Sequence, residues 1–144
     1  HNYKFANNRP ITKSMITWWA FQDENQEIPS LETVFEIEHI YAKKRQESEQ
    51  SLKDLKNLEV LGNKALLEKR INIRASDYRL QDKWKYYVGF VNGKKKKKEG
   101  TKILELRKLG EDKSDFTESD IISRNSNILN AFVQFLRNNG LLAK

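Results

Sequence analysis

The segment at residues 31–40, with the sequence LETVFEIEHI, gives the strongest indication of secondary structure in this chain. Acidic residues alternate in it with apolar ones, which predicts a strand because successive side chains of a strand point to opposite faces. We expect Phe35 and Ile37 to face a core. The strand then ends at Glu38 and His39.

A second strand follows a long charged connection. Residues 42–57 are strongly charged, with Leu52 and Leu55 as the main apolar anchors, and predict a surface helix or an ordered loop. A glycine-asparagine pair then marks a turn, and the apolar run at residues 65–67 predicts a short strand.

Three segments have the apolar spacing of helices. Residues 9–22 carry two tryptophans that we expect in the core, and residues 72–91 follow the second strand. Thr117 and Asp120 have capping-box spacing, which predicts the start of a helix that ends near residue 139. The stripe of residues 72–91 is Tyr78, Leu80, Trp84, Tyr87 and Val88, and that of the last helix is Ile121, Ile122, Ile128, Leu129, Phe132, Val133 and Leu136. The sequence therefore predicts an α+β fold that is mainly helical.

Length and composition limit the class of protein. The 144 residues predict a single domain, 1–144, without the disulfides or Cys-ligated zinc that cysteines would allow. No apolar run approaches the ~20 residues of a membrane span, and no secretory signal is present, so we expect a cytoplasmic protein without a membrane partner. The chain begins without a methionine and is interpreted as the C-terminal part of a longer protein.

Positive charge is concentrated in one part of the chain. The net charge is +7, and residues 60–100 hold twelve Lys or Arg against four Asp or Glu, so the remaining residues are close to neutral. Such a concentration favours a polyanionic partner, most often nucleic acid. The lysine run at 94–98 is expected to be a solvated loop that adds unspecific attraction to phosphates.

Four polar residues occur in an order that is informative as a set. Glu38 and His39 are adjacent, Asn63 follows a glycine, and Asn72 lies nine residues further on, where a helix is expected. Taken singly, each is typical of a strand end, a turn or a helix cap. With the segments EIEHI, LGNKALLEKRIN, DKWKYY and FTESDIISRNSNILNAF, the chain resembles the HNH-type nuclease domain at the C-terminus of GmrSD-like, modification-dependent restriction endonucleases.

This resemblance implies a ββα-metal (HNH) finger at about residues 34–90, embedded in a helical domain, with a packing helix at about 117–139. It implies that His39 is the general base that activates water, and that Asn63 orients it through the backbone of the connecting loop. It also implies that Glu38 and Asn72 bind a divalent cation, Mg²⁺ first and Mn²⁺ as an alternative, because hard cations prefer oxygen ligands.

The resemblance also implies partners. These are DNA and a nucleotide-binding N-terminal domain or subunit, because this chain has no Gly-rich phosphate loop; a homodimer is a further expectation. The residues expected to contact nucleic acid are Lys83, Arg74, Lys64, Lys43, Lys44 and Arg45.

The chain departs from the family pattern at three places. It has YAKK where many relatives have a proline, Lys64 where they usually have leucine, and asparagine rather than histidine at residue 72. The function expected is a metal-dependent DNA endonuclease that restricts foreign or modified DNA. Two alternatives remain: a non-catalytic nucleic-acid-binding module, and an RNase with the same finger.

Overall fold

A computed structural model describes residues 9–75, 80–91, 93 and 97–142, and for residues 73–75 and 80–82 it describes the backbone alone. The helices are α1 (Arg9–Ala20), α2 (Lys43–Glu49), α3 (Lys69–Ala75), α4 (Leu80–Val88), α5 (Leu104–Asp112) and α6 (Glu118–Asn138). The strands are β1 (Phe35–His39), β2 (Lys64–Glu68), β3 (Gly89–Val91) and β4 (Lys97–Glu99). The predicted α+β class is confirmed.

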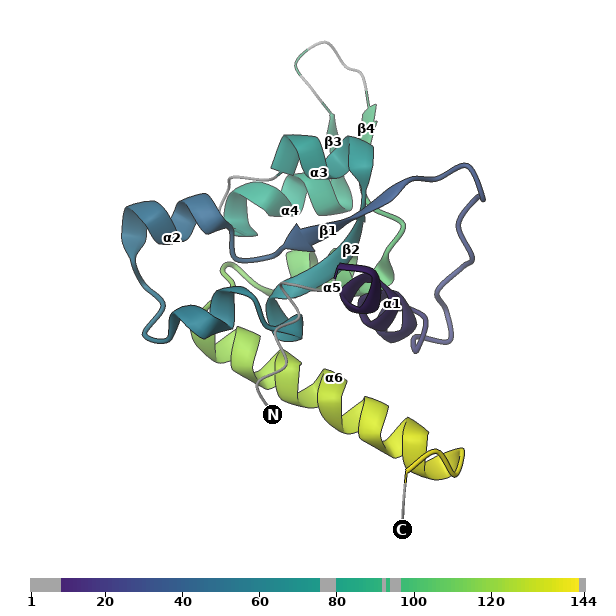
Figure 1. The fold of residues 1–144 in the computed structure, drawn as a ribbon. Coiled ribbons are helices and arrows are strands. Elements are labelled where there is room, and N and C mark those ends of the chain that lie inside the picture. Colours follow the sequence, from purple (N-terminus) through teal and green to yellow (C-terminus); the bar gives the residue numbers. More distant parts are fainter. Residues whose placement is uncertain (1–8, 76–79, 92, 94–96, 143–144) are drawn as a thin grey trace.

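Strands β1 and β2 form an antiparallel pair in the middle of the molecule (Figure 1). Helices α3 and α4 lie on one side of the pair, and α6 lies on the other side, against the 3₁₀ helix Leu61–Asn63. In the register, Glu38 lies opposite Ala65 and His39 opposite Lys64. Both predicted strands are therefore present, and they are neighbours.

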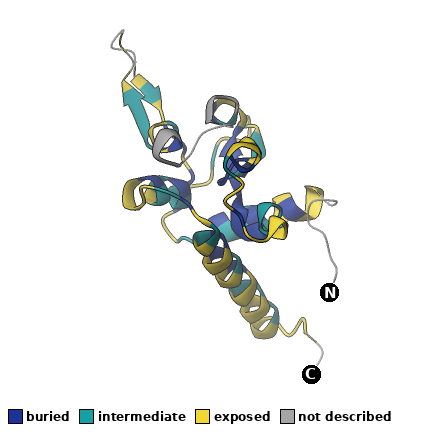
Figure 2. Ribbon diagram, turned by 90° about the vertical axis from the view of Figure 1, so that its left-hand side faces the viewer, coloured by how far each residue is buried: buried dark blue, intermediate teal, exposed yellow. Residues whose placement is uncertain are grey.

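The core surrounds β2, which is buried along its whole length. Figure 2 shows the buried residues gathered there, whereas the far end of α6 is largely exposed and β3 and β4 are a mixture of exposed and intermediate residues. The largest fully buried side chains are Tyr41, Tyr87, Lys83, Phe116, Ile16, Ile40, Leu61, Leu67, Ile103, Leu106 and Ile121. A lysine in this group is unexpected, because lysine is almost never fully buried unless it is paired.

Strand β1 uses both of its faces. Phe35 and Ile37 pack against the core, as expected, but both are only partly buried. The most buried residue of β1 is Glu38, on the other face. A carboxylate therefore lies where an antiparallel strand usually carries an apolar side chain.

Helices α1 and α6 meet through aromatic side chains. The ring of Trp18 lies 5.3 Å from that of Phe132 and 5.5 Å from that of Phe135. Both tryptophans of α1 are only partly buried, so the expectation that they lie in the core holds in part. The fully buried side chains of α1 come from the neighbouring positions Thr12, Ile16 and Ala20.

Several elements differ from the sequence-based expectation. In place of the single helix expected at 72–91, the structure has two helices, α3 and α4, followed by the strand β3. Residues 76–79, which include Tyr78, lie outside the described residues. Part of the lysine run forms β4 rather than a loop, and α5 was not expected. Leu55 is 65% exposed, so of the two expected anchors only Leu52 is buried. No helix among the described residues is long and apolar enough to cross a membrane.

Candidate functional site

Four charged or polar side chains meet at the end of the β1–β2 pair, and we call them the Glu59 cluster: His39, Lys43, Glu59 and Lys64. The Glu59 carboxylate lies 3.2 Å from His39 Nε2, 3.2 Å from Lys43 Nζ and 3.0 Å from Lys64 Nζ. The register explains part of this geometry, because His39 and Lys64 are cross-strand neighbours and share one face of the pair. The cluster thus joins the predicted base to two of the predicted phosphate contacts.

The cluster keeps Glu59 ionised. The hydrogen bond from His39, followed by the contact with Lys64, holds the pKa of Glu59 well below its usual range, although burial opposes this change. Because an ionised carboxylate can only accept, His39 must donate through Nε2–H. In neutral His39, Nδ1 is then the ring atom that can accept a proton from water.

The Glu38 side chain has a separate environment from that of His39. Its carboxylate pairs with the Lys83 ammonium, and both side chains are almost inaccessible to solvent. Lys83 Nζ also donates to the carbonyls of His39 at 2.7 Å and Ile40 at 3.2 Å. Burial, together with the negative charge of Glu38, raises the pKa of Tyr87 well above its usual value, so its hydroxyl stays protonated and donates to Glu38 at 3.4 Å.

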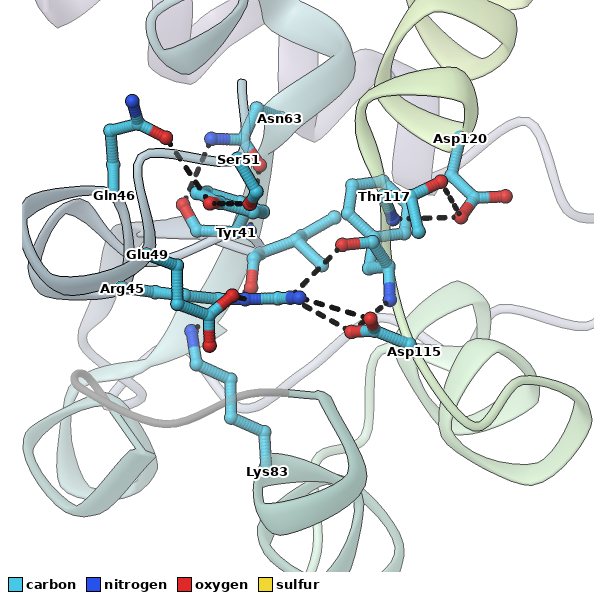
Figure 3. Close-up of polar contacts among 12 residues, drawn as sticks. Tyr41, Arg45, Gln46, Glu49, Ser51, Asn63, Lys83, Asp115, Thr117 and Asp120 are labelled. Atoms are coloured by element: carbon cyan, nitrogen blue, oxygen red, sulfur yellow. Dashed lines mark hydrogen bonds and ion pairs between the residues drawn. The ribbon is translucent and has the colours of Figure 1, made fainter. Parts of the chain in front are cut away.

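Asn63 binds the loop that follows His39. Its Oδ1 accepts from the Tyr41 N–H at 2.7 Å, and its Nδ2 donates to the carbonyls of Tyr41 at 3.1 Å and Leu58 at 2.9 Å. Figure 3 shows the Asn63 amide directed at Tyr41. The Ile40 N–H donates to the Asn63 carbonyl at 2.9 Å. These are contacts of the kind expected for Asn63, and its part in catalysis stays a prediction.

Asn72 hydrogen-bonds to a carboxylate that was not predicted to take part. Its Nδ2 donates to Glu36 at 2.9 Å. Glu36 and Glu38 share a face of β1, two residues apart, and their carboxylates bind different partners. Arg74 belongs to α3, but its side chain lies outside the described residues.

The fit of a divalent cation can be tested against these contacts. A cation on Glu38 would lie beside the Lys83 ammonium, which binds Oε1 of that carboxylate, and like charges repel. In this arrangement Glu38 is paired with Lys83 and the Asn72 amide with Glu36, so the two predicted ligands have different partners, and their binding of a shared Mg²⁺ stays a prediction. Among the described residues, no group of three or more His, Cys, Asp or Glu could hold a metal ion.

The three basic residues that begin α2 differ in accessibility. Lys43 and Lys44 are exposed, whereas the Arg45 side chain is buried. The Arg45 guanidinium donates to Asp115 at 2.8 and 2.9 Å, to Glu49 at 3.0 Å and to the Phe116 carbonyl at 3.2 Å (Figure 3). Arg45 therefore joins α2 to the segment before α6 in this structure.

Glu36, Glu59 and Tyr87 are the residues at these contacts that sequence reasoning missed. Glu59 lies near the end of the charged connection and resembles the other charged residues around it. The signal that could have found it is the pairing of His39 with Lys64, because two donors on one face need an acceptor. Tyr87 was assigned to an apolar stripe, and its hydroxyl gave no separate indication.

Comparisons with known proteins agree with the family resemblance. A family model for the C-terminal domain of GmrSD restriction endonucleases matches residues 2–131, which is most of the chain. No curated protein and no solved structure matches the chain. The family predicted from the sequence is therefore confirmed.

Proposed function

This chain belongs to the family of C-terminal domains of GmrSD restriction endonucleases, and from that premise we propose that it is an endonuclease domain that hydrolyses phosphodiester bonds in DNA. The family name supports DNA as the substrate and a separate N-terminal domain as its partner. Restriction of foreign or modified DNA is the biological role proposed. The proposal includes an HNH finger made of β1, β2 and the helices that follow.

The observation that carries this proposal is the Glu59 cluster. It places an imidazole beside two ammonium groups at the end of the β1–β2 pair. Phosphodiester hydrolysis needs a base for the attacking water and positive charge for the phosphate oxygens. His39 would supply the base through Nδ1, and Lys43 and Lys64 would supply the charge. Asn63 would keep the backbone after His39 in place.

Dependence on a divalent cation is part of the proposal and follows from the family resemblance alone. Mg²⁺ is the first candidate and Mn²⁺ the second, because both accept oxygen ligands. Such an ion would supply Lewis-acid assistance at the phosphate. An ion bound to Glu38 would lie beside the Lys83 ammonium, which holds Oε1 of that carboxylate.

One observation favours a second candidate function. The charge of Glu38 is neutralised by Lys83, and the Asn72 amide is bound to Glu36. If these contacts persist when DNA is bound, the chain would be a nucleic-acid-binding module without catalysis. The basic residues of the Glu59 cluster would then serve binding alone.

The test compares the wild-type chain with His39→Ala on plasmid DNA and on RNA, with Mg²⁺, with Mn²⁺ and with EDTA. The proposal predicts metal-dependent nicking of the plasmid by the wild type only, with DNA binding retained in both proteins. Equal nicking by both would exclude His39 as the base. If neither protein, tested also within the full-length protein, nicks the DNA that it binds, the binding module is the correct function.

A further inference from the structure

The Glu59 cluster contains more positive charge than its single carboxylate balances. Two ammonium nitrogens and one imidazole nitrogen lie within 3.0–3.3 Å of the Glu59 oxygens. The Lys64 side chain is only 4% exposed. A buried ammonium is unfavourable without an anion, so this position must hold a negative group at all times. Glu59 is the group that fills it in this structure.

The donors and the acceptor differ in how firmly they are held. His39 and Lys64 lie on paired strands, and Lys43 begins α2, so three separate elements position the donors. Glu59 instead follows the short 3₁₀ helix Leu55–Leu58, and its side chain is 31% exposed. His39 and Lys64 are thus preorganised on the strand pair, whereas the Glu59 carboxylate faces solvent and can turn away, as can the Lys43 side chain, which is 59% exposed.

The chemistry of the three donors fits a phosphate at least as well as a carboxylate. A phosphodiester offers two charged oxygens, and lysine ammonium groups bind phosphate as point charges. Two anions would repel each other so strongly that Glu59 and a phosphate cannot both occupy this position.

We propose that His39, Lys43 and Lys64 form a binding site for one backbone phosphate of the nucleic acid, and that Glu59 occupies this site as an internal competitor until the substrate displaces it. The proposal rests on the proposed function and deepens it, because it names a residue that sets the affinity for substrate. Glu59 weakens the binding of any single phosphate. Only a polyanion with further contacts, such as those of the basic segment, then displaces it.

The first experiment measures binding without cleavage. The full 144-residue chain is titrated with a DNA duplex in EDTA, as wild type, as Glu59→Gln and as the matched control Glu47→Gln. Glu47 is exposed on α2, so its replacement changes the net charge equally but leaves the cluster intact. We expect Glu59→Gln to bind roughly three- to tenfold tighter, and Glu47→Gln less than about twofold tighter.

The second experiment locates the anion with inorganic phosphate as the probe. The chain has two histidines, so the ring signals of His39 can be assigned with His1→Ala and followed by NMR. Phosphate should shift them at lower concentration in Glu59→Gln than in wild type, and Lys64→Gln in the Glu59→Gln background should remove this gain. If Glu59→Gln does not fold, Glu59→Asp, whose carboxylate reaches less far, should give a smaller gain in both titrations.

The two experiments distinguish the competitor role of Glu59 from the proposed nuclease function. Folded Glu59 variants that bind DNA and phosphate no better than Glu47→Gln would overturn the competitor role and leave Glu59 as a residue that positions His39. Plasmid nicking by the wild type would still uphold the proposed function in that case. Conversely, tighter binding by Glu59→Gln without nicking by any variant would uphold the phosphate site and contradict the nuclease.

Discussion

At the scale of single residues, the neighbours Glu38 and His39 have opposite environments. Successive residues of a strand point to opposite faces, so Glu38 enters the interior and His39 points to the half-exposed Glu59 cluster. Each is bound by a side chain that is distant in the sequence, namely Lys83 for Glu38 and Glu59 for His39. Their adjacency in the sequence therefore does not imply that they act on the same atom.

The ion pair of Glu38 and Lys83 leads to a stability prediction. Lys83→Met should lower the free energy of unfolding by roughly 3–5 kcal/mol, because it leaves a buried carboxylate without its counterion. Urea denaturation at pH 7 measures this loss. In the double variant Glu38→Gln/Lys83→Met the loss should be clearly smaller, since no unpaired charge remains. If the double variant instead loses as much free energy of unfolding as the single variants Glu38→Gln and Lys83→Met together, the two side chains are not coupled.

A second prediction concerns Asn63. Asn63→Ala removes the acceptor of the Tyr41 N–H and two donors to backbone carbonyls, and should destabilise the chain by roughly 2–4 kcal/mol. Hydrogen exchange of the Tyr41 amide should become faster. The control Asn127→Ala, at an exposed position of α6, should change stability by less than about 0.5 kcal/mol. Unchanged exchange at Tyr41 would contradict the role of the Asn63 amide.

At the scale of elements, α6 holds the segment that precedes β2. The Arg124 guanidinium donates to the carbonyls of Leu61, Gly62 and Lys64 at 3.1, 3.0 and 2.7 Å. Asn125 accepts from the Gly62 N–H at 2.9 Å. Because Lys64 belongs to the Glu59 cluster, this helix supports the site from outside the β1–β2 pair.

Gly62 is required for this contact between elements. A Cβ at residue 62 would lie 2.6 Å from Asn125 Cβ and would collide with the Ile121 carbonyl. We expect Gly62→Ala to destabilise the chain by about 2–4 kcal/mol, because backbone cannot yield as a side chain can. Gly93→Ala is the matched control, since a Cβ there would meet none of the described residues within 4 Å. Equal thermal unfolding temperatures of both variants would contradict this account of the packing.

At the scale of the whole molecule, one carboxylate joins three helices. Glu105 of α5 accepts from the indole of Trp19 in α1 at 2.7 Å, and from Arg124 in α6 at 2.8 and 3.0 Å. Burial raises the pKa of Glu105, but the charge and hydrogen bonds of Arg124, with the bond from Trp19, outweigh it and lower the pKa overall.

The lowered pKa of Glu105 gives stability a defined pH dependence. The contribution should be complete above the unfolded pKa of about 4.3 and should decrease as the pH falls below it, because the unfolded chain then binds the proton more readily. Glu105→Gln should be less stable at pH 7 by roughly 2 kcal/mol and should lose less between pH 7 and pH 3.5. The midpoints of urea unfolding at both pH values test this. If wild type and Glu105→Gln lose the same stability between pH 7 and pH 3.5, Glu105 does not contribute to the pH dependence.

Much of the local structure could be predicted from the sequence. Alternation located β1, the apolar run located β2, and the spacing of Thr117 and Asp120 located the start of α6, where the Asp120 carboxylate accepts from the Thr117 N–H at 2.8 Å. These features succeed because strand periodicity and capping depend on residues that are close in the sequence. The stripe of α4 was less accurate: Trp84 is 44% exposed and Lys83 is buried.

The family, the α+β class and the order of His39, Asn63 and Asn72 could be predicted without coordinates, because each depends on local patterns or spacing. The partner of each charged group, in contrast, became visible only in the folded chain. Nothing local distinguishes Glu59 from its charged neighbours, or Lys83 from a solvated helix lysine. Burial and long-range pairing choose between such groups, since a charge that leaves water must find its counterion wherever the fold brings one.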